Sequence, residues 1–259
     1  MTQASERTAA PAAFSFSGVA AMLYGAACYL FFFVTFLYMI GFMADAPFLP
    51  KTVDHGQSTP PLMAALINFA LLGVFALQHS VMARPAFKRA WTQIVPKVAE
   101  RSTYVLAATL CVALLIWQWR PMDQTVWHVT NQSAAYALWA LQGIGWGTVL
   151  LSTYLINHFE LFGLRQTFSF MIGHTPSETA FRTPLLYKHV RHPLYLGFVI
   201  AFWSAPHMSI GHLLFAIGGT GYILVGIFFE ERDLVAHFGQ RYREYQKRVP
   251  MLLPFGKRG

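Results

Sequence analysis

The amino-acid sequence predicts an all-α integral membrane protein: a helix bundle with five or six spans and a C-terminal helical hairpin. The first reason is composition, because the 259 residues are 55% hydrophobic and 12% charged, whereas soluble domains carry about 25% charged residues. The second reason is that apolar residues gather in runs close to about 20 residues, the length of a membrane span. The third is that the positive charges between these runs fall almost entirely on one side of the expected membrane.

Five apolar runs have the length of a span, at 17–43, 61–82, 103–119, 134–156 and 208–229. A sixth run, 194–206, would reach only roughly 20 Å as a helix, which is less than the bilayer core of about 30 Å. It either begins earlier, near Leu185, or forms a hairpin with the fifth run that need not cross. The stretch APHMSIGH that ends it predicts a turn.

Positive charge sets the expected orientation. Of the 19 Lys and Arg residues, only Lys51 and Arg120 fall outside the segments that share one side of the membrane. Positive residues favour the cytoplasmic side, so we expect both termini in the cytoplasm and a bacterial-type inner membrane. The net charge of +8 is then explained by the lipid surface, and we expect no nucleic-acid partner. Nothing in the sequence calls for an obligate protein partner.

Two kinds of site are not predicted. Cys28 and Cys111 lie inside apolar runs, which is typical of buried small residues rather than of a disulfide or zinc site. We therefore expect no metal centre. The sequence has no G-x-G-x-x-G after a strand and no P-loop, so a nucleotide-like cofactor would have to be held by helix ends, turns and side chains.

Polar residues gather at four cytoplasmic ends of the expected spans, in the stretches LQHSVMARPAFKR, YLINHFELFGLRQ, KHVRHPLYLG and FFEERDLVAHFGQRYREYQKRVPMLLPF. Anchoring to anionic lipid explains most of their basic residues. Asn68 and His79, however, are 11 residues apart, about three helical turns, and so share a face that we expect to point into the bundle. Glu230 and Glu231 end a span where an acid facing lipid would be costly, which favours a paired, partly buried site.

The C-terminal part carries a family likeness. RHPLYLG, followed by a hairpin and then by EERDLVAHFGQRYREYQKRVPMLLP, resembles the C-terminal pattern of the isoprenylcysteine carboxyl methyltransferase superfamily over about residues 187–254. The resemblance implies an integral membrane methyltransferase that uses S-adenosylmethionine. The stretches QHSVMARPAFKR and NHFELFGLRQ, with the overall length, are similar to bacterial methanethiol S-methyltransferases, which implies a small thiol acceptor, methanethiol, and dimethyl sulfide as product.

We expect three parts of the chain: a disordered N-terminal lead (1–16), a four-helix transmembrane part (17–156), and a part that the resemblance implies is a cofactor-binding hairpin with a C-terminal lid (157–259). The resemblance also implies that Arg191 and Glu231 hold the charged amino-acid end of the cofactor, and that Tyr242 and Tyr245 fold over it. A guanidinium suits a carboxylate, and aromatic rings attract a sulfonium. The full set of expected cofactor-binding residues is Tyr187, His189, Val190, Arg191, His192, Pro193, Tyr195, Gly197, Glu230, Glu231, Tyr242 and Tyr245.

Methylation of a thiol needs the thiolate, and a cysteine-like thiol with a pKa near 8.5 is mostly protonated at neutral pH. A general base could therefore assist. His79 is the first candidate for this base, followed by His158 or Glu160, because all three lie at the cytoplasmic level. The expected substrate-binding residues are Asn157, Arg165 and Gln166.

Other functions stay open at this point. A related methyltransferase could act on a prenylated cysteine, a phospholipid amine or a longer thiol. A haem or metal-binding membrane protein could use His79 and His158 as paired ligands. A transporter would need polar groups near the bilayer midplane, where Asn68 and a few hydroxyl groups are the candidates.

Overall fold

The structure, a computed structural model, describes residues 14–174 and 181–255. Five of its helices are long and apolar enough to cross a membrane, as the sequence predicted. They are α1 (Phe16–Met43), α2 (Pro61–Ala83), α4 (Lys97–Gln118), α5 (Gln132–Ile156) and α9 (Ile210–Phe238). The described chain is therefore an all-α bundle of a multi-pass membrane protein. Most of the N-terminal lead expected over 1–16 lies outside the described residues, and α1 begins at Phe16.

Shorter elements connect the spans. The helices among them are α3 (Pro85–Trp91), α6 (His158–Leu161), α7 (Leu164–Met171), a 3-10 turn (Leu185–Lys188), α8 (Pro193–Trp203) and α10 (Gln240–Arg248). The strands are β1 (Thr125–His128) and β2 (His207–Ser209), which pair antiparallel.

Local sequence explains where several helices begin. The side chains of Ser15, Asn131 and Ser209 accept hydrogen bonds from the backbone of α1, α5 and α9 respectively, at N–H groups that have no partner inside the helix. Proline stands in the first turn of α2, α3 and α8, where its missing N–H costs no hydrogen bond and its fixed φ suits the helix.

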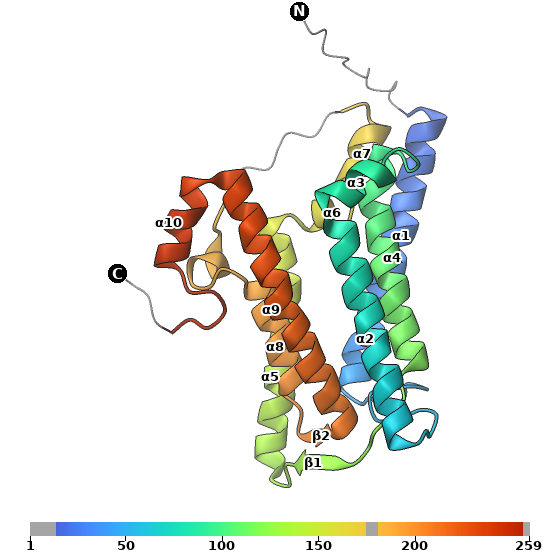
Figure 1. Cartoon of the computed structure of the whole chain (residues 1–259), viewed down its shortest axis with the longest axis vertical. Coiled ribbons are helices and arrows are strands. Elements are labelled where there is room, and N and C mark those ends of the chain that lie inside the picture. Colours follow the sequence, from blue (N-terminus) through green and yellow to red (C-terminus); the bar gives the residue numbers. More distant parts are fainter. Residues whose placement is uncertain (1–13, 175–180, 256–259) are drawn as a thin grey trace, which may run out of the picture.

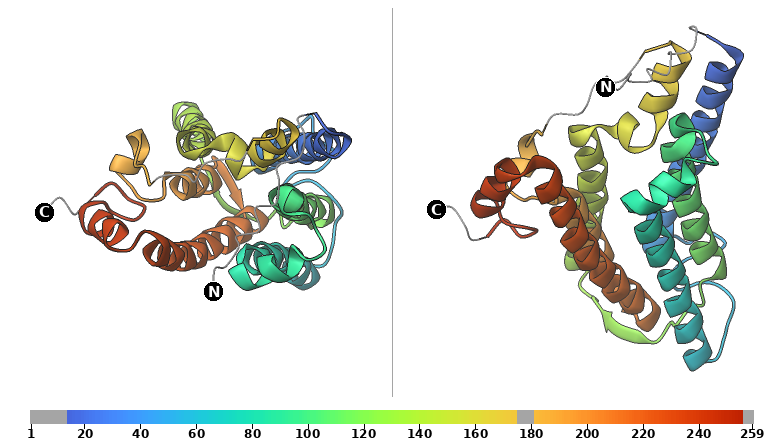
Figure 2. Two further views of the ribbon diagram at one scale, coloured as in Figure 1. Left: turned by 90° about the horizontal axis from the view of Figure 1, so that it is seen from above. Right: turned by 45° about the horizontal axis from the view of Figure 1, so that its top comes forward.

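The helices form two groups (Figures 1 and 2). One group holds α5, α8, α9 and α10, and the other holds α1, α2 and α4 with the short helices α3, α6 and α7. Helix α2 contacts both α4 and α9 and so links the two groups. The short helices lie at one end of the bundle, and the β1–β2 pair lies at the opposite end (Figure 1).

The sixth apolar run forms α8, whose 11 residues are too few to cross a bilayer alone. Strand β2 follows it directly and lies at the end of the bundle away from α10 (Figure 1). Helices α8 and α9 are therefore the two arms of the predicted C-terminal hairpin. The predicted turn is confirmed. It contains His207, and α9, the helix that carries His212, begins directly after it.

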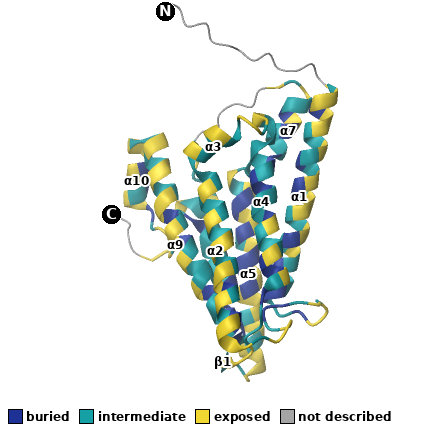
Figure 3. Cartoon of the chain, turned by 45° about the vertical axis from the view of Figure 1, so that its right-hand side comes forward, coloured by how far each residue is buried: buried dark blue, intermediate teal, exposed yellow. Residues whose placement is uncertain are grey.

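Much apolar surface faces outward along the spans (Figure 3). In the most apolar window of α2, only 11% of the residues are buried, and in that of α4 33%. Exposed side chains such as Leu66, Phe69 and Phe228 would be costly in water, so this surface is matched to lipid.

Helices α5 and α8 approach closely because two glycines face each other. A Cβ at Gly145 would lie 2.6 Å from the backbone nitrogen of Ala201, and a Cβ at Gly197 would lie 2.7 Å from the carbonyl oxygen of Gly145. Small residues allow this kind of contact in membrane bundles. The backbone of α8, and with it the segment before Pro193, is positioned by this contact.

Gly145→Ala should destabilise the protein, because the new methyl group would overlap a backbone that cannot move aside. Overpacking of this kind costs about 1–3 kcal/mol, so we expect the Tm of the detergent-purified protein to fall by several degrees. Gly147→Ala, two residues along the same helix, meets nothing within 4 Å and serves as the control. Equal melting temperatures for the two variants would contradict the role of Gly145.

Candidate active site

The four polar stretches of the sequence meet at one end of the bundle, the end that carries α3, α6, α7 and α10 (Figure 1). They form three clusters, around Arg191, around His79 and around Glu160. The shared location follows from the alternating direction of the spans. The side-chain contacts within and between the clusters come from the packing.

Arg191 is the centre of the first cluster, with 9% of its side chain exposed. Its Nε donates to Oε1 of Glu231 at 2.6 Å, and its Nη1 donates to the carbonyl oxygens of Gln246 at 3.1 Å and Val249 at 2.6 Å. The backbone N–H of Arg191 donates in turn to the carbonyl oxygen of Pro250 at 2.9 Å. We call residues 246–251 the C-terminal strap, and Arg191 fastens it to the start of α8.

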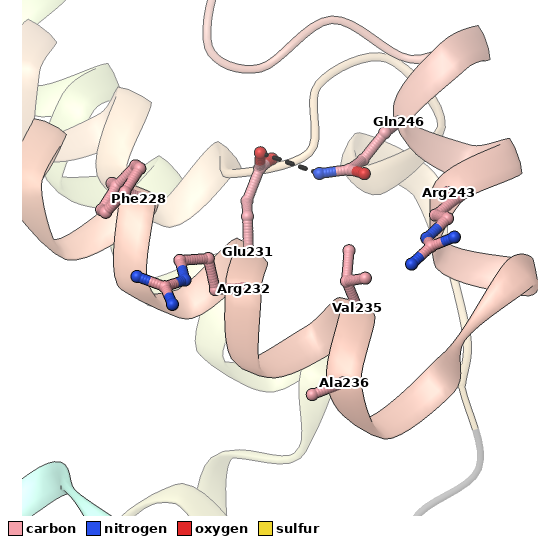
Figure 4. A pocket seen from close by; sticks show the side chains of 7 residues that line it. All are labelled: Phe228, Glu231, Arg232, Val235, Ala236, Arg243 and Gln246. Carbon is pink, nitrogen blue, oxygen red and sulfur yellow. Dashed lines mark hydrogen bonds between the residues drawn. The ribbon is translucent and has the colours of Figure 1, made fainter.

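Glu231 accepts two further hydrogen bonds. Nε2 of His192 lies 3.1 Å from its Oε1, and Nε2 of Gln246 donates to its Oε2 at 3.0 Å (Figure 4). Glu231 and Gln246 also form part of the wall of an open groove of about 730 Å³ between α9 and α10. Both oxygens of this carboxylate are thus occupied by groups of the protein itself.

Glu230, one residue earlier, is arranged differently. Its Oε2 is buried without a hydrogen-bond partner and lies 3.8 Å from Nδ1 of His192. Tyr195 interacts with this carboxylate as a hydrogen-bonding neighbour, and Tyr187 and Tyr242 lie within its electrostatic range. Buried acceptors normally have donors, so a ligand that donates a hydrogen bond to this oxygen would satisfy it.

Two tyrosines close this cluster on the side of α10. The hydroxyl of Tyr245 donates to the carbonyl oxygen of Tyr187 at 2.5 Å. Burial raises the pKa of Tyr245 to about 12, so the phenol stays a donor at neutral pH. Tyr242 is fully buried beside it, and Phe181 packs against both rings.

The structure brings most of the predicted cofactor residues together and separates two of them. Val190 and Pro193 are buried beside the cluster, and the His192 ring packs on Tyr195 with 5.6 Å between centroids. Gly197, in contrast, faces α5, and His189 is exposed. The close approach to α5 explains why position 197 is a glycine, and the cofactor roles of both residues stay predictions.

The second cluster surrounds His79 at the end of α2. The hydroxyl of Tyr104 lies 2.9 Å from Nε2 of His79 and donates to the His79 carbonyl oxygen at 3.3 Å. Phe75 stacks on the imidazole at 5.3 Å, and Tyr222 of α9 meets it edge-on at 6.3 Å. The Nδ1 atom of His79 is buried and has no hydrogen-bond partner.

Tyr195 connects the first two clusters. It lies within electrostatic range of Glu230 and also of Tyr222 and Tyr104. Tyr195 is therefore within electrostatic range both of Glu230 and of the two tyrosines that contact His79.

The third cluster gathers on Glu160. Its Oε2 accepts from Nδ2 of Asn157 and from Nη1 of Arg165, both at 2.5 Å, and its carbonyl oxygen accepts from Nε2 of Gln166 at 3.1 Å. The predicted substrate-binding residues thus meet, with one of the predicted bases in their centre. Gly163 allows the turn, because it has a φ of 89° and a Cβ there would lie 2.5 Å from Oγ of Ser102.

His158 is poorly placed to act as a base. Its Nε2 lies 2.8 Å from the hydroxyl of Tyr29, its Nδ1 lies 2.8 Å from Oγ1 of Thr153, and Tyr154 stacks on it at 4.2 Å. Burial lowers the pKa of His158, which favours the neutral ring. Both nitrogens are engaged in joining α1 to the end of α5, so the contacts explain His158 as a structural residue.

Asn68 points into the bundle as predicted, but not toward a site. Its side chain accepts from the backbone N–H of Arg120 at 2.9 Å and donates to the Arg120 carbonyl oxygen at 2.7 Å. It therefore secures the chain after α4, at the end of the bundle opposite to His79.

Among the described residues, no group of three His, Cys, Asp or Glu side chains is placed to hold a metal ion. His79 and His158 make their contacts with separate sets of residues, as described above. The geometry gives no support to the interpretation that they form a ligand pair.

Comparison with known proteins decides the family. The chain is 56% identical to the methanethiol S-methyltransferase of Mycobacterium tuberculosis, over 92% of this chain and 97% of that protein. It is 54% identical to methanethiol S-methyltransferase 1 of Bradyrhizobium diazoefficiens, over 91% of this chain and 82% of that protein. The chain belongs to the methanethiol S-methyltransferase family.

A more distant likeness joins this family to a larger group. Nurim of Xenopus laevis is 30% identical over 61% of the chain and 58% of its own length. Through such relatives the methanethiol S-methyltransferases belong to the isoprenylcysteine methyltransferase-like superfamily, which confirms the resemblance seen in the C-terminal part. No family model matches the chain, and no solved structure matches it.

Sequence reasoning missed three residues that the structure of this family member brings to the site. Tyr104 and Tyr222 contact His79, and Gln246 completes the partners of Glu231. The sequence holds a weak signal for Gln246, four residues after Tyr242 on the face of α10 that turns toward α9. Nothing distinguishes Tyr104 from other tyrosines in apolar helices until the helices are packed.

Arg191→Lys should loosen the C-terminal strap, because an ammonium cannot bond the Glu231 carboxylate and two strap carbonyls in the same planar geometry. We expect trypsin to cleave after Lys247 and Arg248 several times faster than in the unchanged protein. Arg241→Lys, an exposed position on α10, is the control. Cleavage at the control rate would show that the strap does not depend on Arg191.

Proposed function

We propose that the protein is a membrane-bound methyltransferase that transfers the methyl group of S-adenosylmethionine to methanethiol and yields dimethyl sulfide. The identity to proteins of that name over nine-tenths of the chain is the observation that carries the proposal. The two unpartnered polar atoms, on Glu230 and His79, support it, because one suits a cationic methyl donor and the other suits an acidic thiol.

Glu230 fits the donor. S-Adenosylmethionine carries an ammonium, ribose hydroxyls and a sulfonium, and its ammonium or hydroxyls would donate to the Oε2 atom of Glu230 that lacks a partner. Tyr187, Tyr195 and Tyr242 would supply aromatic faces for the positive sulfur. Arg191 and Glu231 would contribute by holding the C-terminal strap over this side of the site.

When bound, S-adenosylmethionine supplies an electrophilic methyl group, and its sulfur leaves with the electron pair of the broken carbon–sulfur bond. The thiol sulfur forms the new bond to that methyl carbon, and the thiol proton must pass to a base or to water. Nδ1 of His79 would take this proton, since it has no other partner. A positioned base of this kind contributes roughly 10²–10⁴-fold to the rate.

Glu160 and the groups around it would belong to the acceptor side. Asn157, Arg165 and Gln166 are bonded to Glu160, and methanethiol offers no charged group for them. We assign them to shaping the third cluster, and direct contact with the substrate stays a prediction.

We place the protein in the inner membrane with both termini in the cytoplasm, as the distribution of Lys and Arg indicates. The three clusters would then face the compartment that supplies S-adenosylmethionine. We also propose that residues 1–16 form an N-terminal lead, 17–156 a four-helix part and 157–259 a cofactor-binding part with a lid.

Two substitutions should separate binding from chemistry. Glu230→Gln removes a charged acceptor, which is worth about 1.5–3 kcal/mol, so binding of S-adenosylhomocysteine measured by calorimetry should weaken roughly 10- to 100-fold. His79→Gln should leave that affinity unchanged and lower the release of dimethyl sulfide, measured by headspace gas chromatography, at least roughly 10²-fold.

The control is His55→Gln, at the opposite end of the bundle, which should change neither quantity. Full turnover of His79→Gln at neutral pH would remove His79 as the base. Methylation of farnesylcysteine or of a phospholipid amine by the unchanged protein, with none of methanethiol, would overturn the proposed acceptor.

The orientation has its own test. Gln57→Cys and Gln240→Cys are exposed positions at opposite ends of the bundle. A maleimide that does not cross membranes should label Gln57→Cys in spheroplasts and should label Gln240→Cys only after the membrane is permeabilised. The reverse pattern would place the three clusters outside the cytoplasm.

A further inference from the structure

Tyr104 contacts His79 at two points, one on the imidazole and one on the backbone. Its hydroxyl oxygen lies 2.9 Å from Nε2 of the ring and 3.3 Å from the carbonyl oxygen of the same residue. The tyrosine itself is 6% exposed, and the guanidinium of Arg101 lies over its ring at 5.1 Å. Nε of Arg101 is fixed in turn by the carbonyl oxygen of Leu161 at 2.6 Å.

Two observations favour one position for the proton of the His79 ring. A hydroxyl has one hydrogen. When that hydrogen points to the His79 carbonyl oxygen at 3.3 Å, Nε2 is the donor to the tyrosine oxygen at 2.9 Å and Nδ1 keeps its lone pair. In the other tautomer Nδ1 would carry a buried N–H without an acceptor, and orphaned buried N–H groups are rarer than orphaned acceptors.

We infer that Tyr104 is a positioning residue that keeps the proton of neutral His79 on Nε2 and thereby presents Nδ1 as the proton acceptor. The inference rests on the proposed function, because a thiol proton is what Nδ1 would accept. Phe75 and Tyr222 hold the ring plane from α2 and α9, so the tyrosine hydroxyl has to set only the tautomer.

The tautomer can be read directly. In protein purified with ¹⁵N-labelled histidine, NMR distinguishes a protonated ring nitrogen from an unprotonated one, and a His79→Gln sample identifies the signals of His79. We expect an unprotonated Nδ1 and a protonated Nε2 in the unchanged protein, and a mixture of both tautomers in Tyr104→Phe. A protonated Nδ1 in the unchanged protein would overturn the inference.

The matched control is Tyr24→Phe. The hydroxyl of Tyr24 makes a hydrogen bond of the same length, 2.9 Å, to Thr103, the residue before Tyr104. Both substitutions remove one hydroxyl from the α1–α4 region and keep the aromatic ring. Tyr24→Phe should leave the histidine spectrum unchanged, so a change seen in both variants would indicate a general loosening of the bundle and would contradict a specific role for Tyr104.

Kinetics give the second readout. Losing one hydrogen bond that selects a tautomer should lower kcat roughly 5- to 10-fold, with KM for methanethiol and affinity for S-adenosylhomocysteine within about twofold. Tyr104→Phe with full kcat would overturn the inference while the proposed function stands. If the unchanged protein forms no dimethyl sulfide, the proposed function fails, and the spectrum still reports whether Tyr104 sets the tautomer.

Discussion

A guanidinium buried at the end of a membrane bundle has to be paired, and the pairing of Arg191 organises the C-terminal half of this protein. Its partners come from two places: the carboxylate of Glu231 on α9 and the carbonyls of Gln246 and Val249 in the C-terminal strap. Removing one member of a buried pair costs about 3–5 kcal/mol, because the other charge is left without compensation. The start of α8, the end of α9 and the strap are therefore held as one unit.

The hydrogen bonds of Arg191 also determine which polar groups are left to bind a ligand. Both oxygens of Glu231 are occupied by Arg191, His192 and Gln246, whereas Oε2 of Glu230 is buried and makes no hydrogen bond. Two adjacent acids thus differ in their hydrogen-bond partners for a geometric reason, since they lie about 100° apart around the helix. The resemblance implied that the guanidinium of Arg191 binds a carboxylate of the cofactor. In the structure this guanidinium makes its hydrogen bonds within the chain, so its contribution to binding would be to hold the site in shape.

The sequence predicted the features that depend on one helix at a time. Span length, the turn in APHMSIGH (205–212) and the common end of the polar stretches follow from hydropathy, turn residues and charge. Contacts between helices could not be predicted from the sequence. Examples are the close approach of Gly145 and Gly197, the hydrogen bonds at both ring nitrogens of His158, and the contact of the Tyr104 hydroxyl with His79. The pattern of one helix gives the side on which a residue lies, but not the neighbour that it meets.

The two parts of the proposed site come from different groups of helices. The carboxylate of Glu230 belongs to the group of α5, α8, α9 and α10, and His79 belongs to α2 in the other group, with Tyr222 of α9 packed against it. Alignment of a methyl donor with its acceptor tolerates little error, since a displacement of about 1 Å can cost roughly 100-fold in rate. In the proposed mechanism the packing of α2 on α9 would therefore contribute to catalysis, because this contact helps to set the distance between Glu230 and His79.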